Sequence, residues 1–188
     1  MGATSHMLSL HMTQHILAMN IVAPLAALWL KRFRWPHALA QYWVAATTMQ
    51  LALLWGWHAP PVMRAAMANG SLMAAMHITL FLSALWFWSV IFAISKDRRW
   101  QALFALLITG KLFCLLAVLL VLSRAPLFAA DKPTSHLLHA ALMADQQLGG
   151  LLMLVACPAT YLVAAAIIVA RWLSAMARHS SAADAAGT

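Results

Sequence analysis

Several uninterrupted apolar runs of about 20 residues constrain this chain more than any other feature, because that is the length a helix needs to cross a bilayer. Backbone polar groups in lipid must be satisfied internally, so such runs form helices and not open sheets. The composition agrees, since 64% of the 188 residues are hydrophobic and only 9% are charged. We therefore predict an all-α, polytopic membrane helical bundle. This class excludes soluble enzyme folds and nucleic-acid-binding modules.

The apolar runs predict one transmembrane helical domain over residues 8–174. Residues 1–7 form an N-terminal extension, and residues 175–188 form a small, polar cytoplasmic tail that we expect to be disordered. Within the last outer connection, residues 135–144 predict a short helix on the membrane surface, with Ser135 as its N-cap. About five spans are expected, at residues 8–30, 38–57, 73–94, 100–122 and 147–173.

The positions of the basic residues predict the orientation of these spans. Cytoplasmic loops carry an excess of Lys and Arg close to the span ends. Of the 12 Lys and Arg, eight fall in connections on one side, so the net charge of +8 reflects orientation and not a surface for polyanions. We predict that the N-terminus lies outside and the C-terminus inside. The eight residues are Lys31, Arg32, Arg34, Lys96, Arg98, Arg99, Arg171 and Arg178.

Histidines gather at the outer ends of the predicted spans. His11 and His15 are four residues apart and share one helical face, while His58 follows the second span and His77 lies near the start of the third. Neutral imidazole is the commonest metal ligand, and polar groups inside a span are costly without partners. We predict a metal site shared by these four histidines. The alternative is that each imidazole bonds separately to a carbonyl, a lipid headgroup or water.

The surrounding residue types favour a soft metal ion. The chain has no Glu, and its only outer carboxylates are Asp131 and Asp145, so the oxygen ligands of a calcium or magnesium site are missing. Methionines near the outer side include Met12 and Met73, although most methionines in spans only fill space. Imidazole with thioether suits copper, especially Cu(I), while zinc would also accept the histidines.

An enzymatic role is not expected. The segment HMTQH at residues 11–15 has the two-histidine spacing of a zinc-protease helix, but Met12 stands where that motif carries its general-base Glu. Without this carboxylate we discount intramembrane proteolysis.

Three further residues are candidates for a function. Lys111 falls near the middle of the fourth span, where it could face the bundle interior, contact a partner subunit or extend toward the interface. Cys114, one turn away, could form a thiolate relay with Cys157, or both could be inert buried cysteines. His139 lies in the outer connection.

Four short motifs follow one another along the chain: HMTQHILAMNIVAPL at 11–25, WHAP at 57–60, His77 followed by Phe81 and WFW at 86–88, and DQQLGG at 145–150. Their order and spacing together resemble the CtaG family. The members of this family are multi-span membrane proteins implicated in assembling cytochrome c oxidase, with a suspected role in copper delivery. The resemblance extends from His11 to about Leu173.

The resemblance implies a membrane assembly factor of a bacterial inner membrane that binds copper and assists its insertion into the oxidase. The expected partners are a heme-copper oxidase subunit or another copper chaperone, with a second copy of the chain as a further candidate. Asp145 or Gln146 would orient an imidazole from outside the metal's ligand shell. The implied polar set is His11, His15, His58, His77 and Asp145, supported by Gln14 and Gln146, with Met12 and Met73 nearby.

Two other functions stay open at this point. The chain could hold haem b between two axial histidines, His15 with His58 or His77, and transfer electrons. It could instead be a structural partner subunit of an oxidase that binds no metal. A copper permease is less favoured, because only Met19, Asn20 and Cys114 continue the potential ligands inward.

Overall fold

The computed structural model describes residues 7–33, 37–129 and 135–186. All regular elements in these ranges are helices, as predicted. Arg34, Asp131, Lys132 and most of the N-terminal extension lie outside the described residues. The elements are α1 (Met7–Leu17), η1 (Ala18–Val22), α2 (Ala23–Leu30), η2 (Lys31–Phe33), η3 (His37–Tyr42), α3 (Trp43–Trp57), α4 (Pro60–Ala68), α5 (Gly70–Ala93), η4 (Lys96–Arg98), α6 (Arg99–Leu122) and α7 (His136–Ala186).

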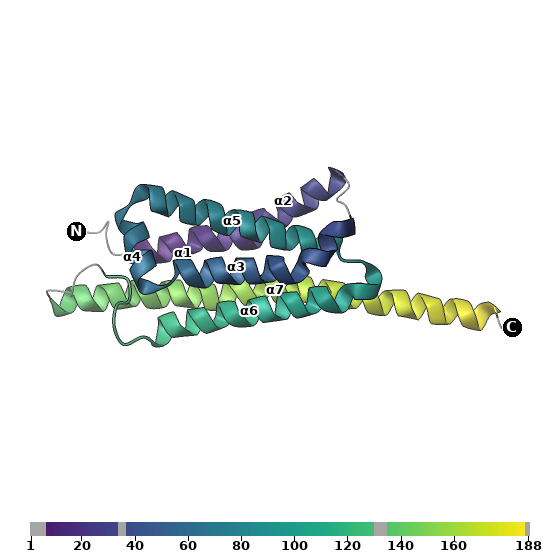
Figure 1. Ribbon diagram of the computed structural model, residues 1–188. Coiled ribbons are helices and arrows are strands. Elements are labelled where there is room, and N and C mark those ends of the chain that lie inside the picture. The colour runs from purple at the N-terminus through teal and green to yellow at the C-terminus, as the bar shows by residue number, and fades with distance from the viewer. Residues whose placement is uncertain (1–6, 34–36, 130–134, 187–188) are drawn as a thin grey trace.

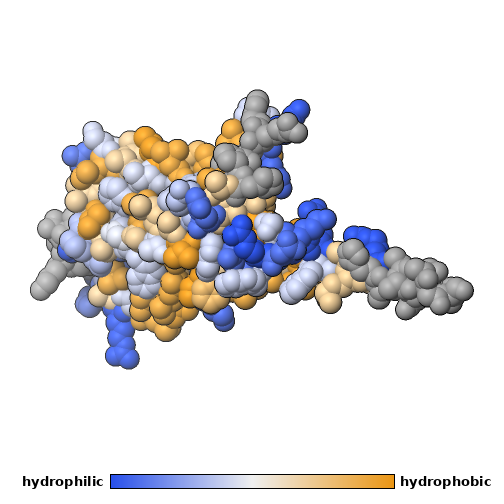
Figure 2. Space-filling view, turned by 45° about the vertical axis from the view of Figure 1, so that its right-hand side comes forward, coloured by the Kyte–Doolittle hydropathy of each residue, from blue (hydrophilic) through white to orange (hydrophobic). Residues whose placement is uncertain are grey.

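Four helical segments are long and apolar enough to cross a membrane: Leu8–Leu30, Gly70–Ala93, Lys96–Leu122 and His136–Arg178. They correspond to four of the five expected spans. The remaining one, α3, has 15 residues and follows the 3₁₀ turn η3, so a fifth crossing stays a prediction, as does the orientation. Figure 2 shows apolar residues spread over the face of the bundle in view, with hydrophilic residues gathered where the C-terminal part of the chain leaves it.

The helices form an elongated bundle in which α7 lies along α6 and α1, and α5 lies along α3 and α2 (Figure 1). Aromatic side chains fill its centre. The rings of Trp88 and Tyr161 stack with centroids 5.5 Å apart, and Phe87 and Phe113 lie 6.0 and 5.5 Å from Tyr161. The Tyr161 hydroxyl accepts a hydrogen bond of 2.9 Å from Gln50 of α3. These contacts bring α3, α5, α6 and α7 to one level of the core.

The first membrane-spanning segment contains a wide turn, because proline interrupts its hydrogen bonds. Pro24 has no N–H to donate to the carbonyl four residues earlier. The Ala23 N–H donates to the Ala18 carbonyl, five residues back, and the π-helical turn η1 results. Two consecutive residues of this turn, Met19 and Asn20, are both buried.

The last helix differs from the sequence prediction. It runs without a break from His136 to Ala186, so residues 135–144 do not form a separate surface helix, and residues 175–186 of the expected disordered tail are helical. Nothing in residues 136–147 ends a helix, because this stretch has no Pro or Gly, and Ser135 caps the continuous helix by accepting from the Leu138 N–H at 3.2 Å. Pro158 lies inside the helix without ending it.

Basic residues gather at one end of the bundle, as the orientation argument requires. The ends of α2 and α5 meet there, since Lys31 donates a 3.0 Å hydrogen bond to the Phe92 carbonyl. η4 and the C-terminal part of α7 lie toward the same end (Figure 1). The opposite end holds α4 and the start of α5, which begins where the Asn69 side chain accepts from the Ser71 and Leu72 N–H groups.

The close approach of α6 and α7 depends on Gly150. A Cβ at this position would lie 2.8 Å from Val121 Cγ2 and 3.1 Å from the Ala117 carbonyl oxygen, so one helix would have to move. We predict that Gly150→Ala lowers the free energy of unfolding by about 1–3 kcal/mol, the usual cost of overpacking. Thermal unfolding in detergent measures this.

Gly56→Ala is the matched control, because a Cβ there meets no atom within 4 Å. We expect it to leave stability unchanged or to raise it by up to about 1 kcal/mol, since alanine favours helix over glycine. Equal melting temperatures for Gly150→Ala and Gly56→Ala would contradict the packing described here.

Candidate metal centre

Three of the four predicted histidine ligands come together. His11 and His15 project from one face of α1, and His77 lies on the facing helix α5. One ligand atom from each lies within 4.8 Å of the others. His11 and His15 are 6% and 5% exposed and His77 is half-buried, so the site is closed on the α1 side. We call His11, His15 and His77 the histidine triad.

The rings of the triad are in direct contact. Their centroids lie 4.2 Å apart for His11 and His15, 4.5 Å for His15 and His77, and 5.0 Å for His11 and His77. His15 Nε2 and His11 Nε2 are 2.7 Å apart. Two nitrogens bound to one ion at about 2.0–2.1 Å would be roughly 3.4 Å apart, so a small rotation of the side chains opens the site to an ion.

A backbone hydrogen bond fixes the tautomer of His77. Its Nδ1 lies 2.8 Å from the carbonyl of Met73, which can only accept, so Nδ1 carries the proton. In the neutral ring the lone pair is then on Nε2, as in most histidines that bind metals. Met73 therefore supports the site through its backbone, whereas the sequence suggested its thioether.

His58 lies beside the triad but apart from its three ligand atoms. Its ring centroid is 6.1 Å from that of His15. The Nδ1–H donates to the Leu54 carbonyl at 2.7 Å, and Nε2 is buried with no hydrogen-bond partner among the described residues. This residue follows the last residue of α3, and burial lowers its pKa to about 4, so the imidazole is neutral at pH 7.

Asp145 positions the helix that carries two triad histidines. Its carboxylate accepts hydrogen bonds from the backbone N–H groups of Leu8 at 2.9 Å and Ser9 at 3.2 Å. A carboxylate at a helix N-terminus satisfies free N–H groups and interacts favourably with the helix dipole. The sequence suggested that Asp145 orients an imidazole directly; these bonds show that it holds the start of α1.

The predicted supporting glutamines lie elsewhere. Gln146 donates to the Leu120 carbonyl at 3.1 Å and accepts from the Leu127 N–H at 2.8 Å, so it fixes the connection after α6. Gln14 is exposed on α1, whereas His11 and His15 are buried. The supporting role suggested for Gln14 stays a prediction, because its side chain is exposed and makes no described contact with either histidine.

The other candidates are also separate from the triad. Lys111 is exposed on α6 and lines, with half-buried Cys114, a groove of about 200 Å³ between α6 and α7. His139 is half-buried near the start of α7. Met12 is 2% exposed and lines a small cavity inward of the triad, together with Met19 and Met153.

Met153 was not among the residues that the sequence singled out, although it lines this cavity. A signal was available, because Met153 and Cys157 are four residues apart and so share one face of their helix. Met12 and Met19 are seven residues apart on the first span, which is about two helical turns, so this spacing also predicts a shared face.

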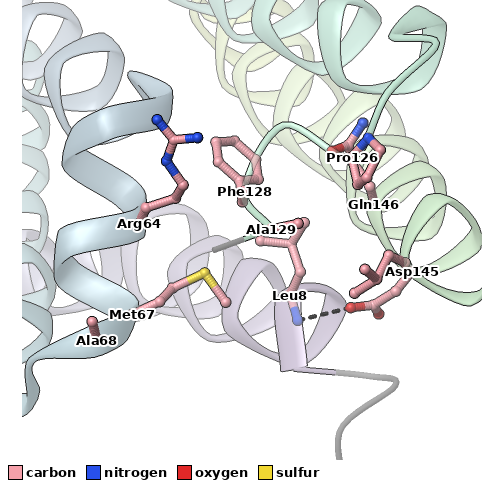
Figure 3. A pocket seen from close by; sticks show the side chains of 10 residues that line it. Leu8, Arg64, Met67, Ala68, Pro126, Phe128, Ala129, Asp145 and Gln146 are labelled. Atoms are coloured by element: carbon pink, nitrogen blue, oxygen red, sulfur yellow. Dashed lines mark hydrogen bonds between the residues drawn. The ribbon is translucent and has the colours of Figure 1, made fainter. Parts of the chain in front are cut away.

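A pocket of about 280 Å³ lies at the end of the bundle where α1 begins (Figure 3). Leu8 and Asp145 line one side of it, and Arg64 and Met67 of α4 line the other. Leu8 lies one helical turn before the histidines of α1, so this pocket is next to the triad. None of the three triad histidines is among the residues that line it.

The geometry suits a single ion better than a haem. A ligand the size of a haem needs a cavity of several hundred Å³. The cavity between His15 and His58 measures only about 10 Å³, and the triad rings touch one another. In this arrangement the axial pairs that the sequence suggested lie closer together than a macrocycle between them would require, and haem binding stays an alternative prediction.

The fold and the site define a class: multi-pass helical membrane proteins with a buried histidine cluster at one end of the bundle. The family model for the cytochrome c oxidase caa3 assembly factor (Caa3_CtaG) matches residues 1–175. The chain therefore belongs to this family, which confirms the resemblance seen in the sequence. The comparisons with curated proteins and with solved structures found no match.

We predict that Asp145→Ala loosens the start of α1. Leaving buried N–H groups unpaired costs about 1–3 kcal/mol, so the Leu8 and Ser9 amides should exchange with solvent roughly 10- to 100-fold faster. Hydrogen–deuterium exchange with mass spectrometry of the peptide containing α1 measures this.

Asp97→Ala serves as the control, since Asp97 lies exposed in η4, where α5 and α6 are joined. Its exchange in α1 should match that of the wild type. Unchanged exchange in Asp145→Ala as well would show that the carboxylate does not hold α1.

Proposed function

We propose that this chain holds copper, as Cu(I), at the histidine triad and passes it to cytochrome c oxidase during assembly. The observation that carries the proposal is the convergence of three imidazoles from two helices within 4.8 Å, in a largely buried position. The family supplies the oxidase as the protein being assembled. The role is that of a carrier and not of a catalyst, in a bacterial inner membrane with the triad on the outer side.

The ligand types support copper over harder ions. Imidazole binds copper and zinc well, whereas calcium and magnesium need several oxygen ligands. The chain has no Glu, and the carboxylate that contacts α1, that of Asp145, already accepts two backbone N–H groups. Methionine sulphur lies close to the triad on its inner side, which favours Cu(I) over Zn²⁺.

Release to a partner requires one ligand that an incoming group can replace. His77 suits this role, because it is half-buried while the two histidines of α1 are buried. The pocket of about 280 Å³ at the start of α1 would give a partner access beside this helix, and the Met67 side chain lines it (Figure 3). A partner ligand that displaces His77 would then take the ion by stepwise exchange.

We predict that His11→Ala/His77→Ala weakens Cu(I) binding at the triad at least roughly 10- to 100-fold, the loss seen when even an outer-shell partner of a metal site is removed. Purified protein in detergent, titrated with Cu(I) against a chromogenic Cu(I) chelator, gives the affinity. The same variant should lower the copper content of the oxidase in membranes that depend on this protein.

His139→Ala is the control, because it removes a half-buried imidazole near the start of α7 and leaves the triad intact. It should bind Cu(I) like the wild type. If the double variant also binds normally and still supports the oxidase, the histidines are structural and the carrier role fails. A Soret band in the purified wild type would support the haem alternative instead.

A further inference from the structure

A second set of soft ligands lies directly inward of the triad. A cavity of about 10 Å³, room for one water-sized or ion-sized occupant, is enclosed between the first span, α3, α6 and α7. His15 belongs to its lining as well as to the triad. The two places are therefore joined by one side chain.

Sulphur is concentrated around this cavity. Four of its ten lining residues carry sulphur, whereas the chain as a whole has 12 Met and 2 Cys in 188 residues. Two come from the first span and two from α7, and each is at most 2% exposed. Methionine often fills space without a chemical role. Here, however, four sulphurs from two neighbouring helices surround one small space: those of Met12, Met19, Met153 and Cys157.

Two buried polar atoms at the same cavity have no partner among the described residues. His58 Nε2 is one, and its Nδ1 proton is already donated to the Leu54 carbonyl, so Nε2 presents a lone pair. The other is Asn20 Oδ1. Leaving a polar atom buried and unpaired costs about 1–3 kcal/mol. Both residues line the cavity, which points to an occupant that interacts with them.

The π-helical turn explains why the first span contributes so many of these groups. A regular helix would turn Met19 and Asn20 to faces 100° apart, but η1 is wider, and both residues are buried. Asn20 Nδ2 donates to Cys157 Sγ at 3.2 Å, which fixes the sulphur in the lining. A donated N–H of this kind also suits a thiolate that binds a metal.

We propose that this cavity is a second Cu(I) site, inward of the triad, with His58 Nε2 and the sulphurs of Met12, Met153 and Cys157 as ligands. The proposal rests on copper being the cargo of the triad. Thioether, thiolate and imidazole together select Cu(I) over Zn²⁺ and over oxygen-seeking ions. When Cys157 binds, its S–H bond breaks, a Cu–S bond forms and the proton leaves to solvent, so the ion adds no net charge to the interior.

His15 and His58 provide two connections from this site to the outside. His15 links it to the triad. His58 also lines a larger cavity, of about 510 Å³, together with Pro60, Ser123 and Phe128 at the end of the bundle where α6 stops. Copper held at the inner site can thus move back to the triad through His15, or toward the larger cavity through His58, without release into water.

X-ray absorption of the Cu(I)-loaded full chain tests the proposal, because it separates sulphur from nitrogen neighbours. In the wild type at one Cu(I) per chain we expect sulphur scattering. Met12→Leu/Met153→Leu should reduce the sulphur contribution by at least half while copper stays bound at the triad. Leucine conserves the volume of methionine, so the fold should tolerate the change.

Met49→Leu/Met176→Leu is the matched control, since both methionines are exposed, at 47% and 56%, and away from the cavity. It should keep the full sulphur signal. His11→Ala/His77→Ala should keep sulphur scattering if the inner site exists. Copper bound with nitrogen neighbours only, in the wild type at every loading, would overturn the inner site and leave the triad standing. Binding of no copper at all would overturn both.

Discussion

The contact between α1 and α7 is the interaction on which the rest of the site depends. The Asp145 carboxylate of α7 accepts hydrogen bonds from the first free N–H groups of α1. One turn further along α7, Gly149 lets the Met12 side chain approach, since a Cβ there would lie 3.2 Å from Met12 Cγ. In an apolar interior such polar contacts are strong, and their loss is costly. The position of α1 in turn decides where two of the three triad imidazoles point. The placement of His11 and His15 therefore depends on the Asp145 contact from α7.

Much of the fold could be predicted, because a bilayer leaves few choices. The apolar runs predicted three of the four long helices to within a few residues, and the i, i+4 spacing placed His11 and His15 on one face. The uninterrupted α7 was missed because the sequence shows where long apolar stretches are but not whether a mixed stretch beside one of them, residues 136–147, continues the helix. The wide turn before Pro24 was missed too, because a proline can be accommodated by a kink, a break or a π turn.

The sequence predicted which histidines lie near one another more accurately than it predicted their individual contacts. Four histidines were expected at one depth, and three of them form the cluster, while His58 faces a different cavity. Spacing along a single helix is fixed by geometry, but distances between helices depend on how they pack, which no local pattern contains. For the same reason the sequence did not show that Asp145 accepts hydrogen bonds from the start of α1, or that Met153 lines a cavity beside Met12.

The layer of Phe87, Trp88, Phe113 and Tyr161 lies next to the sulphur-lined cavity, one turn further along α7 than Cys157. It fills the cross-section between α5, α6 and α7 with stacked and edge-to-face rings. These rings close the side of the cavity that faces the middle of the bundle. A copper ion held in the cavity as proposed would leave past His15 or His58, toward the end of the bundle where α1 begins, and not past the aromatic layer.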